Sequence, residues 1–318
     1  MSHMNFMVRF VTALVCYILI KKYVSLAAYK SILKRRKISM FSFLQHTFMV
    51  YALLLALLIA LAAALLSPFL VLSKQSLIAD GMAHIAFTGV VIGLLFSNEP
   101  LYIALPFALL ASIAITFLTE RANLDNDAAI GVVSVFALAL GLIIISKSDG
   151  FNRSVESLLV GSLLTVTVPE IIGASVLALL VICFILIFYR KLIITTFDVT
   201  HARFAGVNTM FLKYALSALT SIFVVVGVRA IGALLISAFI LFPTLISRQL
   251  SKSFNMTLWG GVIISLIATF IGITVSYHFT LPTGPAIIMV FTTFLVVAYI
   301  IRIIIAKRRL KDAPNARS

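Results

Sequence analysis

Apolar runs of about 18 or more residues recur along most of this 318-residue sequence. Each run approaches the ~20 residues that an α-helix needs to cross the ~30 Å hydrocarbon layer of a membrane. Only 11% of the residues are charged, which is less than half the roughly 25% of an ordinary soluble domain. The alternating ten-residue segments of an outer-membrane barrel are absent, so helices must satisfy the backbone hydrogen bonds. We therefore predict an all-α polytopic membrane protein that folds as a helical bundle.

The apolar runs divide the chain into three parts. Residues 1–40 form an expected N-terminal extension with one short apolar segment, 5–20, followed by a basic cluster. A transmembrane domain is expected at 41–306, and a basic cytoplasmic tail at 307–318. The nine predicted core segments of this domain cover residues 45–72, 77–96, 101–119, 128–146, 168–189, 213–227, 230–247, 257–277 and 284–305.

The net charge of +15 is concentrated in the short connections and tails around the apolar runs. Charge in these places indicates membrane topology and anionic headgroups rather than nucleic-acid binding. The rule that basic residues stay inside makes the tail, the connection after Arg248 and the connection 190–212 cytoplasmic. The same alternation puts the cluster Lys34–Lys37 outside, against the rule. Two explanations stay open: the N-terminal segment lies along the membrane surface, or one segment is re-entrant.

Three shorter features interrupt the pattern of spanning segments. The cytoplasmic connection 190–212 contains a predicted short helix, with Asp198 as its N-cap and Gly206 as its stop. This helix either touches a soluble partner or is an ordinary interfacial connector. Residues 154–167 are too short to span and predict a half-membrane or surface helix on the outer side. Pro282, in the turn at 281–285, either lines a pathway or belongs to a simple loop.

Asp80 and His84 stand four residues apart inside a hydrophobic segment. On a helix this spacing puts both side chains on one face, and Thr88 continues the face as a candidate pathway residue. Ionisable groups near hydrocarbon are costly, so the face should meet a cavity or a partner. Imidazole and carboxylate suit zinc and manganese ions. The alternative is that Asp80 caps the helix and His84 is hydrogen-bonded within the bundle.

Two ligands cannot enclose a divalent ion that prefers about four. A metal site at Asp80 and His84 therefore needs other elements or a second copy of the chain, as in a homodimer with this helix near its two-fold axis. Gly81, Gly89 and Gly93 on the same helix would permit such a close approach.

No glycine in this sequence is followed by lysine, so the phosphate-binding GxxxxGK[ST] loop is absent. Any ATP must be hydrolysed by another protein, and we expect a transport subunit rather than an enzyme. Two alternatives stay open. One is a secondary transporter in which Asp80 and His84 carry protons coupled to a substrate. The other is a non-transporting membrane scaffold.

Four ordered motifs resemble the membrane permeases of bacterial ABC importers for zinc and manganese, whose fold is type II-like. They are SLIADGMAH at 76–84, LVGSLLTVT at 159–167, VRAIGALLI at 228–236 and LPTGP at 281–285. The resemblance spans roughly residues 45–305. Residues 1–40 have no counterpart in it.

The resemblance implies a homodimer with two cytoplasmic ATPase subunits and an external protein that delivers the ion. By the same resemblance, Asp80 and His84 line the central pathway, and Asp198, Arg203 and Gly206 belong to the element that couples to the ATPase. Zn²⁺ or Mn²⁺ is then a transported substrate, and no permanently bound cofactor is expected. Zinc is favoured, because Thr88 stands where many manganese-type members have proline and because the motif at 159–167 is similar to zinc-type members.

Overall fold

The computed structural model describes residues 47–96, 100–122, 124–147 and 166–311, with side chains up to residue 307. All of these residues belong to one compact unit, Phe43–Ser318. The predicted segment 5–20, the cluster Lys34–Lys37, most of the predicted outer helix 154–167 and the tail beyond 311 lie outside the described residues. The described helices are α3 (Thr47–Leu72), α4 (Ile78–Phe96), α5 (Leu101–Arg121), α6 (Asn126–Lys147), α8 (Val168–Phe197), α9 (Val199–Phe204), α10 (Thr209–Ile231), α11 (Ala233–Leu250), α12 (Phe254–Phe279) and α13 (Thr283–Lys311).

In the described part of the chain, nine helices are long and apolar enough to cross a membrane. Each coincides with one of the nine predicted segments, so the predicted helical membrane bundle is confirmed. The helices are often longer than predicted. For example, α8 continues past the expected end at residue 189 to Phe197. Arg190 and Lys191 do not end it, because long basic side chains can extend to the membrane surface while their backbone stays helical.

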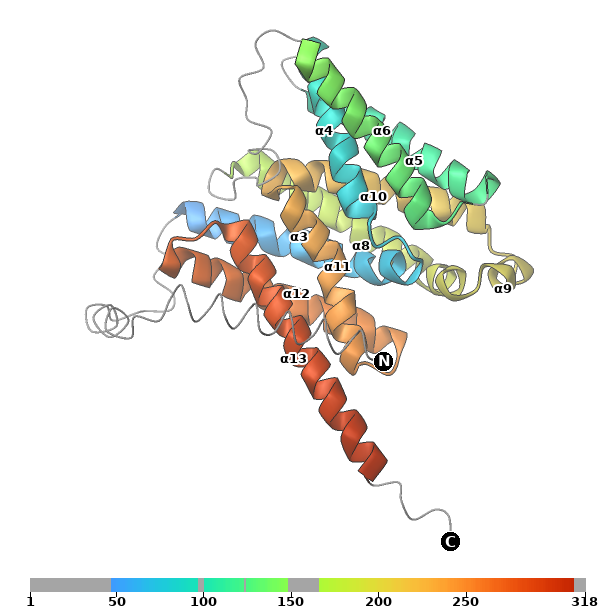
Figure 1. Ribbon diagram of the computed structural model, residues 1–318, viewed down its shortest axis with the longest axis vertical. Helices are drawn as coiled ribbons and strands as arrows, with labels where there is room; N and C mark the ends of the chain where they lie inside the picture. The colour runs from blue at the N-terminus through green and yellow to red at the C-terminus, as the bar shows by residue number, and fades with distance from the viewer. Residues whose placement is uncertain (1–46, 97–99, 123, 148–165, 312–318) are drawn as a thin grey trace. The chain divides into compact units, whose positions relative to one another are not determined.

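Helix α4 packs against α5, α6, α10 and α11 (Figure 1). Its glycines make the approach close: a Cβ at Gly89 would lie 2.7 Å from the Cα of Ala104 in α5, and one at Gly81 would lie 2.6 Å from a methyl group of Ile130 in α6. We expected these glycines to permit contact with a second copy of the chain. That expectation is wrong for this face, because helices of the same chain occupy it.

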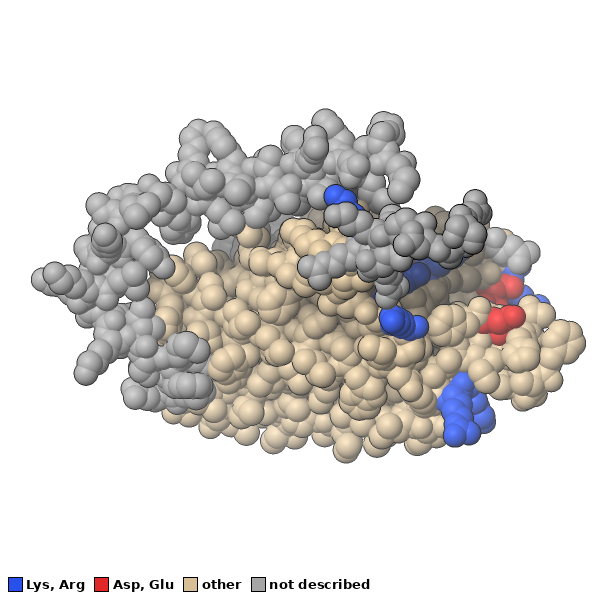
Figure 2. All heavy atoms as spheres, turned by 90° about the horizontal axis from the view of Figure 1, so that it is seen from below, with Lys and Arg blue, Asp and Glu red and all other residues tan. Residues whose placement is uncertain are grey.

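Charged side chains gather at one end of the described helices, and most of the surface visible in Figure 2 is uncharged. This end holds the connections that follow α3, α5, α8 and α11, and it includes α9. By the positive-inside rule it is the predicted cytoplasmic end. Its basic residues include Lys74, Arg121, Arg190, Lys191, Arg203, Lys213, Arg248, Lys252 and Arg302, which donates to Gln249 near the end of α11.

Candidate functional site

Asp80 and His84 lie within the first two turns of α4, which begins at Ile78. Asp80 Oδ2 is 3.8 Å from His84 Nε2, and the two side chains are 61% and 32% exposed. Most other residues of α4 are buried, so the pair forms an open patch on an otherwise enclosed helix. Asp80 is in the first turn, where the positive end of the helix dipole favours a carboxylate. The position of Asp80 therefore fits one part of the alternative interpretation, in which Asp80 stabilises the start of the helix.

Thr88 differs from the pair in being enclosed by the bundle. Its side chain is fully buried, and its hydroxyl donates to the carbonyl oxygen of Ala137 in α6 at 2.7 Å and is 3.2 Å from that of His84. Eight residues at roughly 100° each leave Thr88 about 80° away from Asp80 around the helix. The open patch is thus made by Asp80 and His84, and a pathway role for Thr88 stays a prediction.

Among the described residues, no group of three or more His, Cys, Asp or Glu side chains could hold a metal ion. Asp80 and His84 supply two donors, a carboxylate and an imidazole. Zinc sites in proteins take four ligands, or three and a water. The described part of one chain therefore offers two of the donors that a metal ion would need, on a patch that is exposed, and a metal site here stays a prediction.

The connector between α8 and α10 contains the predicted short helix. Asp198 caps α9 by accepting a hydrogen bond from the backbone N–H of His201 at 2.9 Å. The chain leaves the helix through Gly206, whose φ of +74° is one that residues with a Cβ rarely adopt. Phe204, at the end of α9, is 87% exposed. Sequence reasoning missed Phe204, although a phenylalanine in a short polar connector was a possible signal of docking.

Pro282 lies at the other end of the bundle, in the turn between α12 and α13. It is exposed, and the turn is fixed by a hydrogen bond of 2.7 Å from the hydroxyl of Ser276 to the carbonyl oxygen of Leu281. Pro282 and Asp80 are thus at opposite ends of the bundle, and α9 is at the same end as Asp80.

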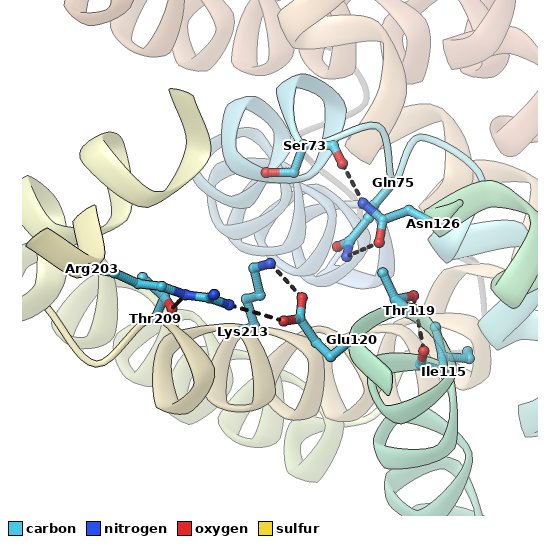
Figure 3. A network of polar contacts seen from close by, with 9 residues as sticks. All are labelled: Ser73, Gln75, Ile115, Thr119, Glu120, Asn126, Arg203, Thr209 and Lys213. Carbon is cyan, nitrogen blue, oxygen red and sulfur yellow. Dashed lines mark hydrogen bonds and ion pairs between the residues drawn. The ribbon is translucent and has the colours of Figure 1, made fainter. Parts of the chain in front are cut away.

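Glu120, near the end of α5, meets two basic side chains (Figure 3). It forms an ion pair with Lys213 of α10, and its Oε2 is 3.7 Å from the guanidinium of Arg203 in α9. Arg203 also donates from Nε to the hydroxyl of Thr209 at 3.3 Å. The Glu120 side chain is only 10% exposed, against 30% for Lys213 and 61% for Arg203. This network was not predicted from the sequence, because Glu120 and Lys213 are 93 residues apart.

A second set of polar contacts joins α6 to the turn before α4 (Figure 3). The amide of Asn126, the first residue of α6, donates to the carbonyl oxygen of Ser73 at 2.7 Å. Gln75 donates to the Asn126 side-chain oxygen over a longer distance of 3.5 Å. A cavity of about 230 Å³ lies among these groups and is also lined by Glu120 and Lys213.

Comparison with known proteins gives consistent matches over most of the chain. The family model described as the ABC 3 transport family matches residues 45–302. A Haemophilus influenzae protein named "Probable iron transport system membrane protein" is 32% identical over 256 residues, which are 80% of this chain and 94% of that protein. MntB of Synechocystis, named a manganese transport system membrane protein, is 30% identical over 258 residues, 81% of this chain and 84% of its own length.

Among solved structures, the chain is similar to "PsaBC from Streptococcus pneumoniae in complex with Fab". The TM-score is 0.71 and the sequence identity is 26%, over 82% of this chain and 94% of the other.

Proposed function

The chain belongs to the ABC 3 transport family, and from this premise we propose how it carries its cargo across the membrane. It is a multi-pass protein of the cell membrane and the permease of an ABC-type metal importer. This membership replaces the two alternatives, a proton-coupled secondary transporter and a non-transporting scaffold. We propose in addition that cytoplasmic ATPase subunits supply the energy and that an external binding protein delivers the ion.

The observation that carries this proposal is the open Asp80–His84 pair on α4. A carboxylate and an imidazole 3.8 Å apart can bind one divalent ion together, but two donors leave its coordination incomplete. We propose that a second copy of the chain presents the same pair across a two-fold axis. The ion would then pass between two Asp80 and two His84 side chains. The close glycine contacts are on another face of α4, so the pairs would approach through their exposed side.

The cargo is proposed to be a divalent transition-metal ion. Imidazole suits zinc and iron, and carboxylate suits manganese, so the two donor types admit all three ions. The sequence favours zinc over manganese, whereas the relatives described above are named for iron and manganese. Zinc therefore stays a prediction, and a competition experiment among the three ions decides it.

The connector with α9 is the proposed docking element for the ATPase. Phe204 is almost fully exposed at the predicted cytoplasmic end. A docked protein with an apolar pocket would remove that ring from water, which stabilises the complex. Asp198 and Gly206 fix the start and end of the helix that presents it, and Arg203 ties the helix to α5.

Uptake by vesicles that contain the permease, its ATPase and its binding protein tests the proposal. We expect ATP-dependent uptake of radiolabelled zinc, manganese or iron(II), and loss of that uptake in Asp80→Ala. Asp127→Ala is the matched control, because Asp127 also lies exposed in the first turn of a spanning helix but has glycine, not histidine, four residues later. If Asp80→Ala takes up as much metal as Asp127→Ala, Asp80 stabilises the start of the helix and does not contact the ion.

A further inference from the structure

Glu120 contacts two cations that belong to different kinds of element. Lys213 comes from α10, a spanning helix, whereas Arg203 comes from α9 in the connector. The Glu120–Lys213 pair therefore joins two helices of the bundle. The Glu120–Arg203 contact joins the connector to the bundle, so a displacement of α9 acts directly on the end of α5.

The two cations differ in how easily they can leave Glu120. Arg203 is 61% exposed and Glu120 is 10% exposed. An exposed ion pair adds little stability, whereas a buried carboxylate that loses its counter-ion is costly. Because Lys213 remains beside Glu120, Arg203 can depart without leaving a buried charge unpaired. The three side chains together carry one surplus positive charge, which makes an acidic group on a docked protein a suitable second partner for Arg203.

The second set of polar contacts, which is separate from the Glu120 ion pairs, lies beside the start of α4 (Figure 3). Helix α5 ends directly after Glu120, and a short connection leads to Asn126 at the start of α6. Asn126 contacts Ser73 and Gln75, which lie in the turn before α4. Asp80 is in the first turn of that helix. The Glu120 ion pairs and the Asn126 hydrogen bonds are thus linked through the short chain between α5 and α6, and the turn that Asn126 holds leads into the helix that carries the proposed metal ligands.

The cavity of about 230 Å³ beside Glu120 and Asn126 leaves these helix ends room to move. Close-packed interiors shift only at the cost of strain. The cavity is bordered by the ends of α3, α5, α8 and α10, so a shift of these ends would displace fewer packed atoms than a shift elsewhere in the core.

We propose that the Glu120–Arg203 ion pair forms and breaks reversibly and that α9 positions the start of α4 through it. We call this ion pair the clasp. Lys213 stays paired with Glu120 in both states. This inference rests on the proposed function, because the ATPase is what moves α9. Glu120 is a positioning residue, since it acts on Asp80 through α5, α6 and the turn before α4.

The first test compares metal uptake with ATP hydrolysis in vesicles that contain the whole importer. In Glu120→Gln, hydrolysis continues, but the number of ions taken up per ATP falls at least roughly fivefold, the lower range of a coupling energy between two sites. In Lys213→Gln, uptake and hydrolysis slow together and the ratio is kept, because Arg203 can no longer leave Glu120 without a cost. The control is Glu170→Gln at the opposite end, since glutamine also serves the capping box in which Glu170 takes part. An unchanged ratio in Glu120→Gln overturns the proposal.

The second test is amide hydrogen exchange of the permease alone in lipid nanodiscs, which needs neither ATPase nor metal. Glu120→Gln should speed exchange both in α9 and in the turn at 73–77. Faster exchange confined to α9 overturns the link to α4, and unchanged exchange in both overturns the clasp itself. If the wild-type vesicles take up no metal, the proposed function fails, whereas the exchange data still decide whether the clasp exists.

Discussion

Replacing Asp80 and His84 by alanine, singly and together, separates a role in transport from a role in folding. The two side chains are 61% and 32% exposed, and Asp80 Oδ2 is 3.8 Å from His84 Nε2. An exposed pair four residues apart on a helix contributes about 0.3–0.5 kcal/mol, and a carboxylate in a first turn adds about 0.3–1 kcal/mol. We therefore expect each single variant to lose no more than about 1.5 kcal/mol of unfolding free energy.

Transport should respond much more strongly than stability. Loss of a residue that only supports a metal ligand lowers metal affinity roughly 10- to 100-fold, so loss of a ligand should lower uptake by at least that factor. Two independent losses would multiply to roughly 100- to 10,000-fold. We expect the double variant to be no worse than either single one, because Asp80 and His84 act on the same ion and either change already breaks the site.

The assay is a double-mutant cycle on zinc uptake at one fixed metal concentration, with thermal unfolding of the four proteins measured in the same detergent. Losses of uptake that multiply would refute a shared site. A loss of several kcal/mol in either single variant would assign the pair to the fold.

Two further predictions concern the packing of α4 and the docking of α9. Gly89→Ala should destabilise the protein by about 1–3 kcal/mol, because the new Cβ would meet the backbone of α5, whereas Gly131→Ala, with open space around it, should not; thermal unfolding distinguishes them. Phe204→Ala should weaken binding of the ATPase roughly 10-fold or more, from the buried area of one ring. Phe279→Ala, at an exposed phenylalanine of the opposite end, should leave that binding unchanged in a pull-down titration.

Local signals in the sequence predicted the features that depend on neighbouring residues. The thickness of the membrane dictates the length of each spanning helix, so the nine apolar runs were sufficient to identify α3–α6, α8 and α10–α13. Asp198 and Gly206 were identified as helix cap and helix stop because both roles depend on residues within one turn. The spacing of Asp80 and His84 likewise predicted a shared face, and the carboxylate oxygen of Asp80 lies 3.8 Å from the imidazole nitrogen of His84.

Features that depend on distant residues could not be obtained this way. Glu120 was not a candidate, because the two residues that give it a role come from elements much later in the chain. Thr88 was expected beside the pair, but its side chain is buried, because α6 packs against it and supplies the acceptor for its hydroxyl. The glycines of α4 gave no sign of which neighbour they meet. In each case the sequence does not reveal which other helix packs against the residue.

The position of Asp80 at the start of α4 has a consequence for release of the ion. A helix N-terminus carries about half a positive charge, which stabilises the carboxylate but opposes a cation bound beside it. The same two ligands in the middle of a helix would hold the ion more tightly. A transport site must let its ion leave, and in the predicted orientation α4 begins on the cytoplasmic side, where release occurs. The Asp80–His84 pair is therefore better suited to a brief contact near the exit than to the closed tetrahedral cage of a structural zinc site.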